Sequence, residues 1–232
     1  MVGSAVRSAD VYRGRVYENE GIPELVGLVD PTHARVIDLG CGVGANMSLL
    51  RERGHEVTGV TLSEDEATLV RSRGFRCLVC DVANENVPLP AASADALLFS
   101  HVLEHLAWPE EALRRSLKLL RPGGGVYVAL PNAVQFRQRW EFFRGRFRYV
   151  ETGITDRTHL RFFDFHSARE LLEGAGVRVS RHLAVGHVPL GPVRRAVGSM
   201  APRLDRLASR LRPGFFGFHI LLAGTWGAGP SP

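Results

Sequence analysis

The chain contains 232 residues with a formal net charge of +5, of which 45% are hydrophobic and 23% charged, as in ordinary soluble globular proteins with a substantial core. It has no apolar run of the roughly 18 residues that a membrane-spanning helix needs, and the N-terminal stretch MVGSAVRSADVYRGR lacks the apolar segment of a secretory signal. Its three cysteines cannot form an even set of disulfides, so we expect a cytoplasmic protein.

The positive charge is concentrated in two segments. Seven arginines stand against three acidic residues between positions 133 and 163, and six arginines stand against Asp205 alone between positions 194 and 212. An arginine-rich composition on solvated faces explains both segments in the simplest way. The alternative is that they meet an anionic substrate, a phosphate group or a membrane surface.

Short β-branched runs alternate with helical patterns along most of the chain. Ser63 and Glu66 predict a capping box at the start of the second helix, and glycines at the ends of the first two helices suit a left-handed backbone. The predicted strands cover 34–40, 55–62, 75–81, 94–100, 124–131, 177–185 and 215–224, and the predicted helices cover 45–54, 63–74, 109–120 and 167–176.

This alternation predicts an α/β fold with right-handed crossovers and a mostly parallel, doubly wound sheet. The rhythm stops after Pro131, where residues 132–165 are rich in aromatic residues and arginine and have weak periodicity. We expect them to form an inserted basic and aromatic cap over the carboxyl edge of the sheet. Residues 193–212 predict a basic amphipathic helix before the last strand.

The first strand runs into a glycine-rich turn, IDLGCGVGANM, in which Asp38 precedes Gly40, Gly42 and Gly44. Glycines in a strand-to-helix turn let backbone N–H groups approach a ligand closely. A dinucleotide site usually has an acid at the end of its second strand for the ribose, but this chain has Thr61 there.

Four sequence blocks together resemble class I S-adenosylmethionine-dependent methyltransferases. They are VIDLGCGVGANMSLL, CDV at 80–82, VPLPAASADALLFSHVLEHL and LKLLRPGGGVYVALPN, and the resemblance covers roughly residues 34–131. It implies a single domain over 1–232 with a Rossmann-like, seven-stranded sheet whose last strand is antiparallel. It also implies S-adenosylmethionine as the cofactor.

By this resemblance, Asp38 and the three glycines would hold the methionine part of the cofactor, and Asp81 would accept from the adenine amino group. Thr61 can offer one hydroxyl to the ribose, where most family members offer a carboxylate. Val82 and Ser100 complete the expected cofactor site.

The region after the fifth predicted strand resembles a narrower subgroup, the proteins related to the methionine-biosynthesis protein MetW and to ubiquinone-type O-methyltransferases. Such proteins carry an asparagine at this point, here Asn132, then an arginine and aromatic helix. A segment D-x-T-H-x-R-F-F follows, which here covers residues 156–163.

The stretch FSHVLEHL follows the fourth predicted strand, at the edge where doubly wound folds bind ligands. One turn of helix would place His101, Glu104 and His105 on one face. In a first interpretation, one of the histidines 101, 105 and 159 is a general base on an acceptor hydroxyl.

In a second interpretation, the same four residues (His101, Glu104, His105 and His159) bind a divalent metal. Ubiquinone-type enzymes carry E-x-x-E-H with a later histidine at this place, as magnesium ligands. His101 replaces the first glutamate here, and magnesium prefers oxygen donors, so we favour proton transfer over metal binding. In a third interpretation, Glu104 and His105 only satisfy backbone groups beside the cofactor.

The sequence therefore predicts an enzyme that methylates a hydroxyl of a small molecule, such as a sugar, a glycolipid or a secondary metabolite. The arginines suit an acceptor that carries negative charge. The alternatives are an N- or C-methyltransferase, or a MetW-like partner protein that binds the cofactor without acceptor chemistry of its own. We do not expect a nucleic-acid substrate, because the basic stretches are short and separated. A peripheral membrane contact through residues 193–212 stays open, as does the oligomeric state.

Overall fold

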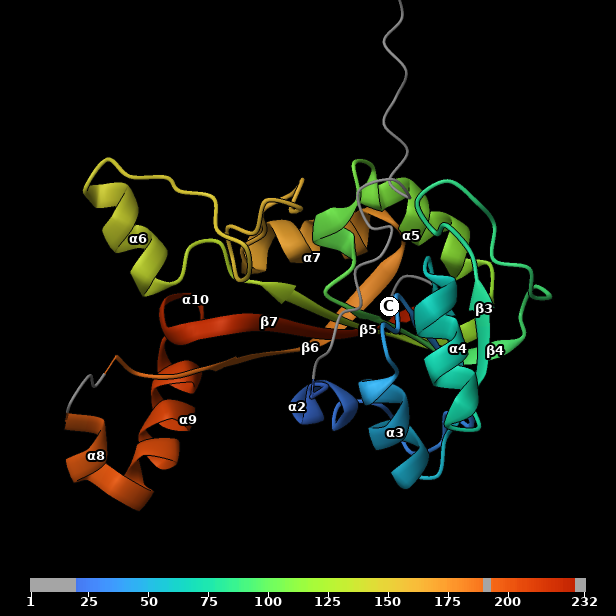
Figure 1. Ribbon diagram of the computed structural model, residues 1–232, viewed down its shortest axis with the longest axis horizontal. Coiled ribbons are helices and arrows are strands. Elements are labelled where there is room, and N and C mark those ends of the chain that lie inside the picture. The colour runs from blue at the N-terminus through green and yellow to red at the C-terminus, as the bar shows by residue number, and fades with distance from the viewer. Residues whose placement is uncertain (1–19, 190–192, 228–232) are drawn as a thin grey trace, which may run out of the picture.

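The computed structural model describes residues 20–189 and 193–227 of the chain. Seven strands form one sheet in the order β3-β2-β1-β4-β5-β7-β6 (Figure 1). The strands are β1 (Arg35–Leu39), β2 (Glu56–Thr61), β3 (Arg76–Val79), β4 (Ala94–Ser100), β5 (Leu120–Pro131), β6 (Val177–Gly186) and β7 (Gly217–Trp226).

The first five strands pair in parallel, whereas β7 runs antiparallel to both of its neighbours, β5 and β6. The predicted α/β, Rossmann-like, doubly wound sheet of seven strands with an antiparallel last strand is therefore confirmed. Because β3, β2, β1 and β4 are consecutive and parallel, their carboxyl ends meet at one edge of the sheet.

Helices cover both faces of the sheet. One hydrophobic cluster joins Leu25, Met47 and Val70 of the helices α2, α3 and α4 to one face, and a second joins Leu113 and Leu172 of α5 and α7 to the other (Figure 1). The helices on the two faces are α2 (Pro23–Val26), α3 (Ala45–Glu52), α4 (Glu64–Ser72), α5 (Pro109–Leu117) and α7 (Phe165–Gly174).

Local sequence signals explain most of the helix boundaries. Gly54 and Gly74 follow α3 and α4 with φ of +90° and +78°, the left-handed conformation that we predicted for them. The helix predicted over 109–120 ends earlier, at Leu117, because Leu120 already pairs with Ala94 of β4. The fifth strand is correspondingly longer than predicted at its beginning.

Residues 132–165, the predicted cap, leave the sheet at the carboxyl end of β5. They contain α6 (Phe136–Phe143), which buries none of its residues, and an irregular return to α7. Asn132 attaches the start of this segment to the end of the chain: its Nδ2 donates to the carbonyls of Gly214 (3.1 Å) and Gly217 (2.8 Å). Its Oδ1 accepts from the N–H of Val134, and the residue is fully buried.

The region in which we predicted one basic helix contains several short ones. These are α8 (Val193–Val197), a 3₁₀ turn η2 (Gly198–Met200), α9 (Ala201–Leu211) and α10 (Pro213–Phe216). The break falls at Gly198, which has φ of +53°. Within the described ranges, none of the helices has the length and apolar character needed to cross a bilayer.

The buried amide of Asn132 generates a stability prediction. Asn132→Ala should lower the free energy of unfolding by about 2–3 kcal/mol, because the buried carbonyl of Gly217 and the half-buried carbonyl of Gly214 lose their donor. Urea denaturation monitored by circular dichroism measures this change. Asn86→Ala is the control, since Asn86 is exposed, and it should stay within about 0.5 kcal/mol. Equal effects of the two changes would contradict the structural role of Asn132.

Candidate functional site

The carboxyl edge of β1, β2, β3 and β4 brings the predicted cofactor residues together. Each lies in the last positions of one of these strands or in the segment that follows it. They are Asp38, Gly40, Gly42 and Gly44 at the end of β1, Thr61 at the end of β2, Asp81 and Val82 after β3, and Ser100 at the end of β4.

The glycine turn packs directly against the segment that follows β4. Gly40, Gly42 and Gly44 all have positive φ, between +52° and +84°, which residues with a Cβ rarely adopt. A Cβ built on Gly40 would lie only 2.3 Å from Cγ2 of Val102. The turn therefore needs glycine both for its conformation and for the close approach of Gly40 to Val102. His101 directly precedes Val102, so the glycine turn lies beside the histidine cluster.

Among the buried acids that the structure describes, Asp38 is the one with both carboxylate oxygens unpaired. It is fully buried, and neither carboxylate oxygen has a hydrogen-bond partner among the described residues. Burial raises the pKa of this carboxyl from 3.8 to about 7. An unpaired buried carboxylate beside a glycine turn fits a ligand that brings N–H donors and positive charge, and the methionine ammonium of S-adenosylmethionine offers both.

A second buried acid lies where the sequence appeared to lack one. The Thr61 hydroxyl donates to Oε2 of Glu66 at 2.5 Å, and both residues are buried. Glu66 thus brings a carboxylate from the first turn of α4 to the end of β2, the position at which the ribose acid was missing.

The capping box predicted from Ser63 and Glu66 forms only in part. Ser63 Oγ accepts from the N–H of Glu66, as predicted, but the N–H of Ser63 donates to Thr61 rather than to the Glu66 carboxylate. The sequence pattern predicted that the Glu66 carboxylate would cap the start of α4. The signal that could have identified it is the pairing of an acid in the first turn of α4 with a threonine at the end of β2.

Asp81 lies at its predicted place, but its carboxylate already holds the following turn. Oδ1 accepts from the N–H of Ala83 and Oδ2 from the side chain of Asn84, both at 2.9 Å. Each oxygen keeps a second lone pair, so this arrangement orients the carboxylate without exhausting its capacity to accept.

The cluster in FSHVLEHL does not form the single helical face that we predicted. Only Leu103–His105 form a turn of 3₁₀ helix (η1), and His101 precedes it in the left-handed conformation, with φ of +56°. This conformation is uncommon for a residue with a Cβ and is found at functional sites. The two histidines consequently point to different partners.

His101 forms a pair with a buried glutamate. Its Nδ1 lies 2.9 Å from Oε1 of Glu104, and its ring meets the ring of His219 at 4.8 Å between centroids. Glu104 is fully buried; burial alone raises its pKa, but the hydrogen bond and the charges of His101 and His105 outweigh that effect and lower it. An ionised carboxylate accepts only, so Nδ1 carries a proton, and in the neutral imidazole the lone pair therefore lies on Nε2.

His219 of β7 is a site residue that the sequence did not reveal. It is distant in the chain from the other histidines, and only the antiparallel insertion of β7 beside β5 brings it to His101. Burial, followed by the charge of His101, lowers its pKa to about 4. His219 is therefore neutral at physiological pH.

His105 turns to the 156–163 segment. Its Nδ1 lies 3.1 Å from the Thr158 hydroxyl, which donates to Asp156 at 2.7 Å, and 3.3 Å from the Thr158 carbonyl. His159 Nδ1 lies 2.8 Å from the carbonyl of Ile154. A carbonyl only accepts, so both histidines carry a proton on Nδ1.

Glu104, His105 and His159 form a group whose ligand atoms lie within 4.8 Å of one another. Two imidazoles and one carboxylate are a donor set that suits zinc or iron better than magnesium. The group does not include His101, so the predicted four-residue set is separated by the fold into a His101–Glu104 pair and a Glu104–His105–His159 group. Glu104 belongs to both.

The Cys77-x-x-Cys80 pair does not form a site. Cys77 and Cys80 lie in the hydrophobic clusters on opposite faces of the sheet. Cys77 instead lies against Cys41 of the glycine turn, with 3.9 Å between their sulfurs.

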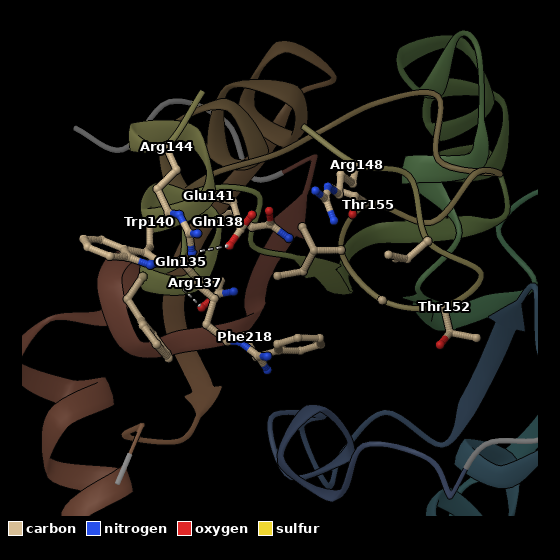
Figure 2. A pocket seen from close by; sticks show the side chains of 14 residues that line it. Gln135, Arg137, Gln138, Trp140, Glu141, Arg144, Arg148, Thr152, Thr155 and Phe218 are labelled. Carbon is tan, nitrogen blue, oxygen red and sulfur yellow. Dashed lines mark hydrogen bonds and ion pairs between the residues drawn. The ribbon is translucent and has the colours of Figure 1, made fainter. Parts of the chain in front are cut away.

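A cleft of about 820 Å³ lies between α6, residues 148–155 and the start of β7. Figure 2 shows side chains of α6 along one wall and of residues 148–155 along the other, with Phe218 of β7 between them. Ile154, which holds His159, also lines the cleft, and Phe218 precedes His219. The lining combines apolar groups with three arginines: Phe136, Trp140, Val150, Ile154 and Phe218 with Arg137, Arg144 and Arg148.

Comparison with known proteins identifies the same kind of domain. A family model described as a methyltransferase domain matches residues 12–182. A probable S-adenosylmethionine-dependent methyltransferase of Mycolicibacterium smegmatis is 32% identical over 152 residues, which is 66% of this chain and 55% of that protein. A ubiquinone biosynthesis O-methyltransferase of Idiomarina loihiensis is 29% identical over 106 residues, 42% of each chain.

The chain thus spans about half the length of these curated relatives. Among solved structures, an S-adenosylmethionine-dependent methyltransferase from Archaeoglobus fulgidus matches with a TM-score of 0.63 and 21% identity, over 88% of this chain and 95% of that one. This similarity is one of fold.

The buried Asp38 generates a prediction about pH. Its folded-state pKa of about 7 exceeds the ordinary 3.8, so the folded state loses stability as the pH rises from about 4 to 7 and does not regain it above. Asp38→Asn should remove this cost, which is at most about 4 kcal/mol, and make the ligand-free protein more stable at pH 8 but not near pH 4. Urea denaturation at the two pH values tests this, with the exposed Asp65→Asn as control. An Asp38→Asn variant that is less stable than the unaltered chain at pH 8 would contradict this prediction.

The Thr61–Glu66 pair generates a prediction about cofactor affinity. Glu66→Gln should weaken S-adenosylmethionine binding by about tenfold, because a neutral amide replaces a charged acceptor. Isothermal titration calorimetry measures the change. Glu64→Gln, on the exposed side of the same helix, should leave the affinity unchanged. Equal affinities of the two variants would show that Glu66 serves the helix and not the cofactor.

Proposed function

Because the chain belongs to the family of class I S-adenosylmethionine-dependent methyltransferases, we propose that it transfers the methyl group of this cofactor to a hydroxyl of a small molecule. The observation that carries the proposal is the His101–Glu104 pair beside the glycine turn. The ubiquinone biosynthesis O-methyltransferases among the relatives support an oxygen acceptor.

The cofactor supplies an electrophilic methyl group on a sulfonium. Asp38 and the glycine turn would hold its methionine part, the Thr61–Glu66 pair its ribose and Asp81 its adenine. The residues of this chain then have two tasks, to position the acceptor oxygen and to remove its proton.

His101 is suited to remove that proton. Glu104 holds its Nδ1–H at 2.9 Å, so the lone pair on Nε2 is directed away from the carboxylate. The same carboxylate stabilises the imidazolium that forms when Nε2 takes the proton. His219, kept neutral by burial, packs against the His101 ring without adding a second charge.

The cleft of Figure 2 fits an acceptor with an apolar body and anionic groups. Phe136, Trp140 and Phe218 offer apolar surface, while Arg137 and Arg148 offer positive charge. A sugar derivative, glycolipid or secondary metabolite with an acidic group has this chemistry.

A metal-dependent reaction is a second candidate, and one observation favours it. The ligand atoms of Glu104, His105 and His159 lie within 4.8 Å of one another, close enough to share one cation. A cation bound there would lower the pKa of an acceptor hydroxyl. The burial of His105 lowers its own pKa, which favours the neutral imidazole, the form that binds a metal, at neutral pH.

The rival from another class is a partner protein that binds the cofactor and has no acceptor of its own. Titration of the chain with S-adenosylmethionine, followed by methyl transfer from the labelled cofactor to small-molecule fractions of a host extract, separates the two. Cofactor binding without any labelled product would favour the partner protein. A product labelled at nitrogen or carbon would overturn the hydroxyl assignment.

Single substitutions distinguish the base from the metal. If His101 takes the proton, His101→Ala should lower kcat by about 10²-fold or more with cofactor affinity retained, and chelation should have no effect. His159→Ala should then retain most of the activity. Turnover that chelation abolishes and zinc restores, with the larger loss in His159→Ala, would assign the reaction to the metal.

A further inference from the structure

Helix α9 is oriented with its apolar side toward solvent. Its buried residues are Ala201, Asp205 and Ser209, which recur every four positions on one side. Its leucines lie on the other side: Leu204, Leu207 and Leu211 are 37%, 54% and 69% exposed. A helix at the surface of a globular protein normally buries the leucines and exposes the acid.

Polar contacts hold the helix in this orientation. Asp205 accepts from the N–H of Val188 at 2.8 Å and from the guanidinium of Arg194 at 2.6 Å. These contacts and the charge of Arg194 lower the pKa of Asp205 against the effect of its burial, so it stays ionised. Turning the leucines inward would expose the Asp205 contacts to solvent and break them. The native orientation of α9 therefore keeps its leucines on the outside.

Apart from Asp205, the charged residues of α9 are all arginines. Arg203, Arg206 and Arg210 are exposed on α9 beside them. Asp205 is the only acid between positions 194 and 212, and Arg194 neutralises it. A second copy of this chain placed across the leucines would bring its own arginines to the same contact, where like charges repel. An anionic surface meets both the leucines and the arginines.

The helix lies at the same end of the molecule as the cleft. α10 contacts α9, and the rings of Phe215 and Phe216 in α10 meet that of Phe136 in α6, with centroids 6.1 Å and 6.5 Å apart. Figure 1 shows α6, α10 and α9 together beyond the carboxyl end of β5. Here α6 also exposes Trp140 (58%) and Phe143 (84%).

We propose that α9 docks the protein on an anionic phospholipid surface. Leu204, Leu207 and Leu211 enter the boundary between headgroups and acyl chains, and Arg203, Arg206 and Arg210 meet the lipid phosphates. Docking places the cleft between α6 and residues 148–155 close to the bilayer, where an amphiphilic acceptor resides. The inference rests on α9 and not on the proposed chemistry.

Flotation with vesicles tests the proposal on the full chain. The protein should float with vesicles of phosphatidylcholine and phosphatidylglycerol but not of phosphatidylcholine alone, and high salt should weaken the binding. Leu207→Glu should lower the lipid-bound fraction by about tenfold or more. The control is Leu69→Glu: Leu69 is 41% exposed on α4, at the other end of the molecule, and this change should not alter binding.

Calorimetric titration with S-adenosylmethionine keeps the outcomes distinct, because both variants should bind the cofactor like the unaltered chain. Failure to float with anionic vesicles, or an equal loss in Leu69→Glu, would overturn the proposal whether or not the protein methylates anything. Light scattering that finds a dimer which Leu207→Glu converts to a monomer would also overturn it, since the leucines would then form a protein interface.

Discussion

The buried carboxylate of Glu104 is the contact on which the arrangement of the acceptor side depends. It has no access to water, so it needs charged or N–H partners within the fold. His101 provides one partner for this carboxylate. The backbone carbonyl of Glu104 accepts from the N–H groups of Leu160 and Arg161. One residue thereby joins the end of β4 to the 156–163 segment and holds His101 in an uncommon backbone conformation.

Three buried acids share this edge of the sheet, and each is satisfied to a different degree. Asp38 has no partner among the described residues and a pKa raised to about 7, Glu66 accepts from Thr61, and Glu104 is paired with His101. A fold optimised for stability alone would not keep Asp38, because its ionisation is costly where it lies. Asp38, without a partner for either oxygen, lies beside the glycine turn, and Glu104, with one oxygen paired to His101, lies on the acceptor side. This arrangement matches a ligand that supplies donors at one end and a reaction that needs a placed base at the other.

The predictions that succeeded depended on periodicity and on local chemistry. Alternating strands and helices, glycines with positive φ after α3 and α4, and acids at strand ends all follow from a few neighbouring residues. The predictions that failed depended on assuming regular structure. One helical turn was assumed for FSHVLEHL, but His101 adopts a left-handed conformation that separates it from His105, and the glutamate assigned to the capping box bonds to Thr61 instead. Sequence spacing describes a face only when the backbone is regular.

By itself, the sequence determined the fold, the position of the glycine turn and the set of residues at the carboxyl edge, because parallel strands must place their carboxyl ends together. Only the tertiary structure decided which of those residues are partners. It brought His219 to His101 through the antiparallel β7, Glu66 to Thr61 across the start of α4, and His159 to His105 through the returning loop. It also turned the leucines of α9 outward, against the usual preference of an amphipathic helix, because Asp205 binds Arg194 and Val188 on the inner side. Contacts between residues distant in the chain depend on strand register and side-chain packing, and the spacing of neighbouring residues predicts neither.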